Sequence, residues 1–371
     1  MVPSNASISC QSSCMDLSQR RLRNQYINGS RLDDPAEVVR ALGAVQAQDY
    51  YSALWAIGLR LHGVCEATVE QAIAERRILR TWPMRGTLHF VATEDVRWLI
   101  ELLAPRTLQR NAARLLRDFA IDRPVIKRAS KIVQAALSGG NALTRVALYE
   151  QLDAHRIDTG QQRGLHILWW VAHEGLICCG PRAGKQHTFV LLDEWVPTPS
   201  SLTREESLAL LARRYFAHHG PATLADFVWW SGLTVVDANV AIEGARSQLS
   251  SEEHDKTTWW SGAGAPGRTI RSARCHLLPV YDEYTVGYAD RSAALDPVHA
   301  KHVVAGHGIF RAPIVIEGRV VGSWTRKIKK DRVDIHVVPL TRFDREQLRH
   351  IHDAAERYGK FLGLAANVSK S

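Results

Sequence analysis

The sequence predicts an α+β fold that is predominantly helical, and the order of its expected elements is the main reason. Three successive segments share one plan, in which helices separated by turns lead into a hydrophobic hairpin. The C-terminal part differs, because strand-like runs come first there and one long helix follows. The three segments have irregular lengths, so we interpret them as a repeated architecture and not as a short solenoid repeat.

In the first segment, Asp16 or Ser18 can cap a helix that runs to Asn28. Asp34-Pro35 opens a second helix, since proline in the first turn loses no N–H that the helix needs. The other elements expected there are a helix over residues 69–76 and two strands within residues 78–91, which turn at Arg85-Gly86.

The second and third segments repeat this plan. We expect the second to contain helices over residues 127–137, 144–154 and 162–174 and a hairpin within 176–191. We expect the third to contain helices over residues 204–218, 223–229 and 234–249, a glycine-rich wing around 259–267, and a strand that reaches Leu278. Helix-turn-helix followed by a β-wing is the winged-helix plan, in which a recognition helix enters the major groove of DNA.

The C-terminal part predicts a small β unit. Its expected elements are strands over residues 309–316, 318–324 and 333–339, a closing helix over 342–362, and a tail that frays from Ala365. The sequence thus predicts three tandem winged-helix domains followed by a small β unit and a C-terminal helix. The expected boundaries are a disordered tail at 1–15, winged helices at 16–125, 126–200 and 201–279, and the β unit at 280–371.

Composition places the chain among soluble globular proteins, with 46% hydrophobic and 23% charged residues. No apolar run approaches the roughly 18 residues that span a bilayer, and residues 1–14 lack the features of a signal peptide. The six cysteines form no C-x-x-C motif, so we expect reduced thiols in a cytoplasmic protein without zinc or an iron–sulfur cluster. The spacing of His299, His302 and His307 is weak as a metal-binding pattern.

The charge indicates a polyanionic partner. The formal net charge is +9 and the isoelectric point is about 9.4, and each Lys or Arg placed on a phosphate releases counterions. One helix face concentrates this charge without an obvious acidic neighbour: Arg106, Arg110, Arg114 and Arg117. Like charges at this spacing repel unless an anion lies between them. We expect this face to bind phosphates, and the alternative is a solvated helix face.

A second basic cluster lies between two strand-like runs and predicts the tip of a hairpin. It consists of Arg326, Lys327, Lys329, Lys330 and Arg332. Flanking strands would hold these cations on a rigid element, which favours precise contacts with DNA beside a catalytic site. The alternative is protection of a sheet edge, since exposed lysines also prevent edge-to-edge pairing.

Two glutamines, Gln46 and Gln48, stand two residues apart in an otherwise apolar stretch, followed by Asp49, Tyr50 and Tyr51. A buried glutamine must satisfy two donors and an acceptor, which makes it a poor choice for a core. The pair therefore indicates a site that holds something polar, such as a water or a base edge. The alternative is a pair of amides that cap a helix or brace a turn.

The sequence contains no P-loop, no dinucleotide-binding glycine motif, no H-E-x-x-H and no G-x-S-x-G. Asp282 and Glu283 lie among tyrosines, and paired carboxylates of this kind could do acid–base chemistry. The alternative is that they cap or brace a turn and pair with Arg291 or another arginine.

Three stretches, at residues 80–90 (Arg-Thr-Trp-Pro-Met-Arg-Gly-Thr-Leu-His-Phe), 278–284 and 318–324, resemble signatures of a bacterial winged-helix DNA-binding family. That family includes the AlkZ-type DNA glycosylases, and the resemblance covers residues 17–362. Gln46-Ala47-Gln48 is similar to the family's Gln-Φ-Gln motif; a related branch has Asp at the second position, where this chain has Gln48. The resemblance implies removal of bulky alkylated purines and unhooking of interstrand crosslinks, often in producers of DNA-alkylating natural products.

The residue chemistry agrees with this implication. A glutamine cannot ionise, so it can neither protonate a leaving base nor activate water as a carboxylate does. A purine alkylated at N7 or N3 is already cationic and departs readily, so two amides need only place a water and direct dipoles at the positive sugar. We therefore predict that Gln46 and Gln48 are catalytic in a monofunctional DNA glycosylase without a cofactor. Bulky adducts also argue against flipping the base into a tight pocket.

The expected partner is double-stranded DNA with alkylated purines, contacted by both basic clusters and also by Arg85, Arg291 and His299. Two alternatives remain open. The first alternative is a non-catalytic winged-helix DNA-binding regulator, which would explain the positive charge but not the two glutamines. The second is a protein whose winged domains bind other proteins, which would leave the arginine stripe without a role. Regulators are commonly dimers, and no dimerisation helix is visible in the sequence, so we expect a monomer. We expect this monomer to associate with the nucleoid and not with a membrane.

Overall fold

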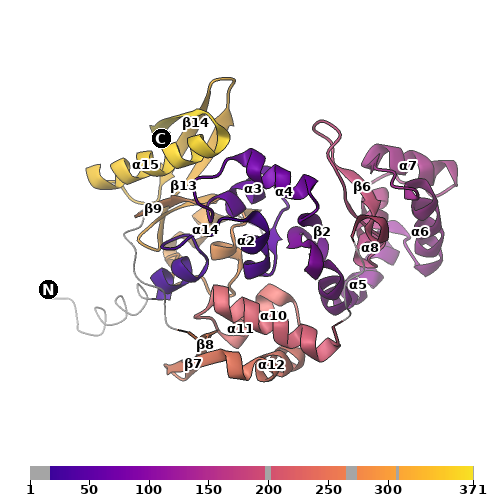
Figure 1. Ribbon diagram of the computed structural model, residues 1–371, viewed down its shortest axis with the longest axis horizontal. Coiled ribbons are helices and arrows are strands. Elements are labelled where there is room, and N and C mark those ends of the chain that lie inside the picture. The colour runs from indigo at the N-terminus through magenta and orange to yellow at the C-terminus, as the bar shows by residue number, and fades with distance from the viewer. Residues whose placement is uncertain (1–16, 197–201, 265–273, 306–308, 371) are drawn as a thin grey trace.

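The computed structural model describes residues 17–196, 202–264, 274–305 and 309–370, and it is a mixed α/β molecule (Figure 1). Figure 1 shows the C-terminal sheet and helix beside the N-terminal helices, while the second segment extends away on the other side and the third segment lies below. Among the described residues, no helix is both long enough and apolar enough to cross a membrane.

The first segment builds the small sheet that carries the glutamines. Its antiparallel strands have the order β1-β3-β2, with β1 at Val45–Gln46, β2 at Ile78–Met84 and β3 at Thr87–Ala92. The predicted turn at Arg85-Gly86 is confirmed, and both residues have positive φ, as a tight hairpin turn requires. The helical elements are residues 17–24, α2 (Pro35–Leu42), α3 (Tyr50–Gly58), α4 (Glu66–Ala74), η1 (Thr93–Asp95) and α5 (Val96–Phe119).

The second segment follows the predicted plan. Its helix α6 buries Ile126, Ala129, Val133 and Leu137, which recur at helical spacing on one face. Strands β4, β6 and β5 form an antiparallel sheet in that order, so the predicted hairpin is confirmed. The elements are α6 (Arg123–Leu137), β4 (Leu143–Thr144), α7 (Arg145–Ala154), α8 (Arg163–His173), β5 (Ile177–Cys179), β6 (Thr188–Leu191) and α9 (Leu192–Trp195).

The third segment has the predicted helices but a different wing. Helix α12 ends at Gly244 and a hairpin turns at Asp255-Lys256, so the prediction of a wing around residues 259–267 was wrong in position. The end of that stretch, residues 265–267, lies outside the described residues. The elements are α10 (Arg204–His219), α11 (Leu224–Ser231), α12 (Val235–Gly244), η2 (Arg246–Gln248), β7 (Leu249–His254) and β8 (Thr257–Gly262).

The C-terminal sheet has five strands in the order β15-β14-β13-β12-β9. The expectation that the tail frays from Ala365 was wrong, because β15 pairs in parallel with β14 and places Ala366 opposite Val333. Gly363 permits this return, since its positive φ ends the preceding helix. The elements are β9 (Cys275–Leu277), α13 (Glu283–Val286), η3 (Pro297–His299), α14 (Ala300–Val303), β10 (Val304–Ala305), β11 (Ile309–Phe310), β12 (Ala312–Ile316), β13 (Arg319–Ile328), β14 (Arg332–Pro339), α15 (Arg345–Leu362) and β15 (Ala365–Lys370).

The first segment and the C-terminal sheet share one hydrophobic core. The Trp55 indole N–H on α3 donates to the Leu277 carbonyl at 2.7 Å, and its ring meets those of Tyr358 and Phe361 on α15. A side chain at Gly58 would overlap the Phe361 ring, so only glycine permits this contact between α3 and α15. The glutamine strand is therefore supported from the C-terminal part of the chain.

A buried ion pair joins the turn that follows α3 to the residue that caps α13. Arg60 and Asp282 are both fully buried and share two N–H···O bonds of 2.9 Å. The remaining Arg60 donors reach the carbonyls of Ala56 and Gln25 and the Gln25 side chain. Buried charges persist in a protein only when they are paired and hydrogen-bonded in this way. This pair therefore fixes where α13 begins relative to α3.

We expect Asp282→Asn to destabilise the protein by about 3–5 kcal/mol, because the Arg60 charge would stay buried without its counter-ion. Urea denaturation followed by circular dichroism measures the free energy of unfolding. The control is Glu94→Gln, which breaks the largely exposed pair with Arg40 and should cost about 1 kcal/mol or less. Equal losses in the two variants would contradict a special role for the buried pair.

Candidate active site

The backbone of Gln46-Ala47-Gln48 is held on several sides. Strand β1 pairs Gln46 with His89 of β3, and the next N–H, that of Ala47, donates to the Leu88 carbonyl at 2.7 Å. The buried Arg80 guanidinium donates two bonds, of 3.0 and 2.7 Å, to the Ala47 carbonyl. The motif is therefore a rigid strand end and not a flexible loop.

The two glutamine side chains lie in different environments. Gln48 is exposed, and its Oε1 accepts one long bond of 3.4 Å from the Leu88 N–H. Gln46 is partly buried, and among the described residues no group hydrogen-bonds its buried Oε1. Neither amide caps a helix; Asp49 caps α3 instead, by accepting a 2.7 Å bond from the Ser52 N–H. A buried acceptor without a partner is costly, so hydrogen bonding within the described part of the protein does not explain this glutamine, and Gln46 is not among the residues that line the cavity beside Gln48.

A buried carboxylate lies behind the motif. Glu283 is 1% exposed, and its Oε1 accepts the Gln46 backbone N–H at 3.1 Å. Its Oε2 accepts the Trp230 indole N–H at 2.9 Å and lies 3.4 Å from His219 Nε2. Burial alone would raise the pKa of Glu283, but His219, followed by the charge of Arg85, brings the pKa down to about 2. The group is therefore an ionised carboxylate that does not reach solvent.

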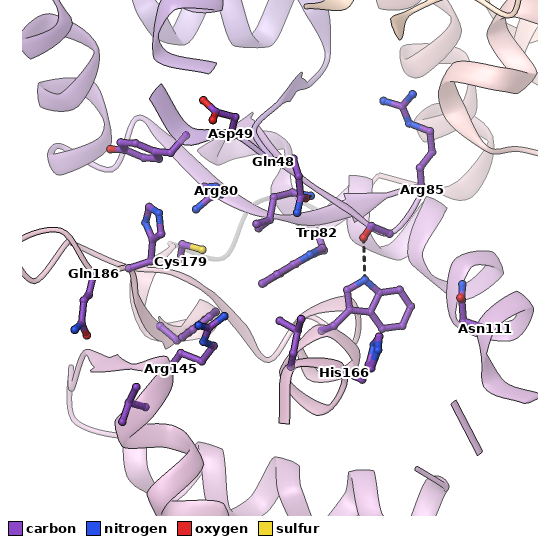
Figure 2. A pocket seen from close by; sticks show the side chains of 18 of the residues that line it. Gln48, Asp49, Arg80, Trp82, Arg85, Asn111, Arg145, His166, Cys179 and Gln186 are labelled. Carbon is purple, nitrogen blue, oxygen red and sulfur yellow. Dashed lines mark hydrogen bonds between the residues drawn. The ribbon is translucent and has the colours of Figure 1, made fainter. Parts of the chain in front are cut away.

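Gln48 borders a cavity of about 850 Å³ between the first and second segments. Figure 2 shows Gln48 and Trp82 on one side of this cavity and Arg145 and His166 on the other. The Trp169 indole on α8 donates a 3.0 Å bond to the Gly86 carbonyl, which ties the second segment to the β2–β3 turn. Aromatic and apolar groups line much of the wall, and five cations line it too: Arg80, Arg85, Arg114, Arg145 and Lys185.

Arg85 occupies the β2–β3 turn and lines this cavity. Its Nη2 lies 3.1 Å from His89 Nε2. Burial lowers the pKa of His89 to about 3, and the neighbouring charge of Arg85 adds to this effect, so the imidazole is neutral at physiological pH. A neutral His89 can accept a hydrogen bond from Arg85, which orients the guanidinium.

The structure separates the four arginines of the α5 stripe. Arg114 lines the cavity and contacts Asn111 at 3.4 Å. Arg106 and Arg110 are exposed on the preceding turns of the helix. Arg117 makes two bonds, of 2.7 and 3.2 Å, with Asp118, so the expectation that the stripe lacks an acidic partner was wrong for this residue. Arg114 is thus the member of the stripe that the cavity includes.

The C-terminal basic cluster begins within a strand. Arg326 and Lys327 belong to β13 and Arg332 belongs to β14, so the prediction that they form a hairpin tip was wrong for these three residues. Arg326 lies 3.8 Å from Asp49, next to Gln48, while Lys327 and Lys330 are exposed. Two other members pair with Asp334: Lys329 at 2.6 Å and Arg332 at 3.1 Å. Arg326 therefore links this hairpin to the glutamine motif.

The remaining predicted residues lie elsewhere. Asp282 caps α13 and pairs with Arg60, which confirms that it braces a turn through an arginine. Arg291 instead donates to the Thr285 carbonyl and lies over the Trp229 ring at 5.3 Å. His299 is in η3, with its ring 6.0 Å from that of His302, and His307 lies outside the described residues. Among the described residues, no cluster of three His, Cys, Asp or Glu suits a metal ion.

Sequence reasoning missed the groups that the second segment brings to the cavity. Arg145 and His166 belong to α7 and α8, and Lys185 belongs to the β5–β6 turn, all far from Gln48 in the chain. The turn is itself fastened to the first segment, since Arg182 contacts Glu70 at 3.3 Å and the Tyr51 hydroxyl at 3.0 Å. The sequence feature that could have pointed to this part of the cavity is the turn at residues 180–185, which carries Arg182 and Lys185.

Comparison with known proteins gives a consistent result. Residues 39–361 match the model of the AlkZ-like DNA glycosylases. The chain is 25% identical to an interstrand DNA cross-link repair glycosylase of Streptomyces sahachiroi, over 94% of this chain and 95% of that protein. The solved structure of Streptomyces sahachiroi DNA glycosylase AlkZ superposes with a TM-score of 0.79 at 21% identity, covering 96% of this chain and 99% of that one.

The family model spans most of the chain and includes the glutamine motif, the cavity and the buried carboxylate. The chain therefore belongs to the AlkZ-like family of DNA glycosylases.

Proposed function

We propose that this glycosylase excises cationic alkylated purines, including bulky adducts and interstrand crosslinks, with Gln46 and Gln48 as its catalytic residues. One observation carries the proposal: the exposed Gln48 lies on a rigid strand end at a cavity lined by cations, and two residues before it the buried Gln46 Oε1 has no hydrogen-bond partner among the described residues. The relative from Streptomyces sahachiroi, an interstrand DNA cross-link repair glycosylase, supports the crosslink as one substrate.

The chemistry follows from the charge of each group. A purine alkylated at N7 or N3 leaves as a neutral base, so the site does not have to supply a proton. The developing positive charge lies on the sugar, where amide oxygens held in place stabilise it and position a water for attack. The cations of the cavity suit the phosphates on either side of the lesion, and Arg114 of the α5 stripe is one of them.

Three winged-helix domains remain our proposal for the helical segments, because each has the helix-turn-helix and hairpin order. Such domains could hold a duplex without drawing a crosslinked base out of its stack. We also propose that the C-terminal hairpin contacts DNA beside the lesion through Lys327 and Lys330. Arg326 would align the hairpin with the motif by its approach to Asp49.

We expect Gln48→Ala to lower excision of N7-methylguanine by about 10²-fold, the scale for losing one preorganised dipole. Single-turnover excision, read as strand breaks after hot alkali, measures the rate. The melting temperature should change by at most a few degrees, because Gln48 is exposed. DNA retention without strand breaks in the wild-type protein would instead indicate a binding protein.

The matched control is Asp49→Asn, because Asp49 is the exposed carboxylate next to Gln48 and could act as a general base. Asparagine is also a good helix cap, so α3 should be preserved. We expect Asp49→Asn to keep the rate within a few-fold of wild type. If Asp49→Asn lowers the excision rate as much as Gln48→Ala does, Asp49 and not Gln48 would be the residue that activates the water.

Arg114→Ala should weaken binding to any duplex about equally and reduce the slope of log affinity against log salt by roughly one unit. The reason is that one phosphate contact at the cavity would be lost. Titration of a labelled duplex at several salt concentrations gives the slope. Arg117→Ala is the matched comparison on the same helix and should change the slope less, since Asp118 already neutralises Arg117. An unchanged slope for Arg114→Ala would contradict a phosphate contact by this residue.

Lys185 lines the same cavity, so a covalent route through a lysine has to be tested directly. We expect a monofunctional reaction with water as nucleophile, and therefore no protein–DNA adduct when borohydride is added during turnover. Gel electrophoresis under denaturing conditions detects such an adduct. An adduct that disappears in Lys185→Ala would show that the enzyme uses a Schiff base.

A further inference from the structure

The N–H of Gln46 does not depend on the sheet for its hydrogen bond. Strand β1 is two residues long and lies at the edge of its sheet, with β3 as its one neighbour. The Ala47 N–H points to β3, where it donates to the Leu88 carbonyl. The Gln46 N–H points to the opposite side and donates to Glu283 Oε1 at 3.1 Å. Glu283 thus takes the place that a neighbouring strand would occupy.

Glu283 is itself fixed by the third segment. The Trp230 indole of α11 donates to Glu283 Oε2 at 2.9 Å, and His219 of α10 lies 3.4 Å from the same oxygen. Trp230 and His219 are fully buried, and the Tyr215 ring stacks on His219 with centroids 4.7 Å apart. The carboxylate therefore cannot change rotamer without breaking contacts in the core of the third segment.

We propose that Glu283 is a positioning residue for the reaction: by holding the Gln46 N–H, it fixes the strand that presents both glutamines to the substrate. This inference rests on the proposed catalytic role of Gln46 and Gln48. It also gives the third segment a part in catalysis, although none of that segment's described residues lines the cavity beside Gln48. A displacement of about 1 Å in a catalytic group can lower a rate by roughly 10²-fold, so a single hydrogen bond at this point matters.

The test compares substitutions of Glu283 in a Trp230→Phe background. Trp230→Phe removes the indole donor at Oε2 and leaves the bond to Gln46, so the single-turnover rate of this variant is the reference for the comparison. With Glu283→Gln added, the amide oxygen can still accept the Gln46 N–H. The new NH₂ group faces Nε2 of His219, whose pKa is lowered by burial, and the Nε2 of a neutral imidazole can accept its hydrogen bond.

We expect Glu283→Gln in this background to keep the excision rate of the Trp230→Phe protein to within about threefold. Glu283→Ala in the same background should lower it by roughly 10–10²-fold while duplex affinity stays unchanged, because the cavity cations are untouched. This split between rate and affinity, with rescue by glutamine, is not expected from a merely structural role. Equal rates for the alanine and glutamine variants would overturn the proposal.

Two further measurements keep the outcome decisive. In the wild-type protein, the backbone amide of Gln46 should be protected from hydrogen exchange, although it faces away from its own sheet, because it donates to Glu283. Rapid exchange of this amide would overturn the proposal, and this measurement does not require the alanine variant to fold. Gln48→Ala is run in parallel. If Gln48→Ala keeps the wild-type rate, the proposed catalytic role of the glutamines is wrong. If Gln48→Ala lowers the rate and Glu283→Ala does not, only the positioning role of Glu283 is wrong.

Discussion

The buried ion pair between Arg60 and Asp282 is the constraint on which the rest of the site depends. Both groups are fully removed from water, so each must satisfy the other, and the two 2.9 Å bonds leave little freedom in their relative position. Asp282 also accepts the Tyr284 N–H and so sets the first turn of α13. The next residue, Glu283, consequently reaches the Gln46 backbone. Two adjacent carboxylates thus connect α3 to the glutamine strand through the interior.

Much of the architecture could be predicted from local signals. The Arg85-Gly86 turn and the helices of the second segment follow from turn chemistry and periodicity, and the structure has them where they are expected. Helix α3 was missed because residues 50–58 are apolar almost all round, so no polar face reveals a helical period. Strand β15 was missed because its parallel pairing with β14 is a long-range contact that local sequence does not encode.

The site itself was predictable only in its exposed half. Gln46 and Gln48 were found because amides are out of place in an apolar stretch, and Arg114 because its stripe has helical spacing. Glu283 was considered as an acid–base group or a turn brace, and its actual partner is a backbone N–H more than two hundred residues away. Arg145, His166 and Lys185 come to the cavity through the packing of α8 on the β2–β3 turn. Such contacts depend on tertiary structure and leave no local pattern.

The arrangement places the neutral amide of Gln48 at the cavity, next to Asp49, and the buried carboxylate of Glu283 behind the glutamine strand. A carboxylate in direct contact with the substrate would have to be kept ionised beside the phosphates of DNA. Glu283 avoids this, because His219 and Arg85 hold its pKa at about 2 within the protein. The Glu283 carboxylate accepts the Gln46 N–H, while the exposed Gln48 lines the cavity. If Gln46 and Gln48 act as we propose, their amides stabilise a positive sugar and supply no proton, and the proposed selectivity for cationic lesions would follow from that chemistry.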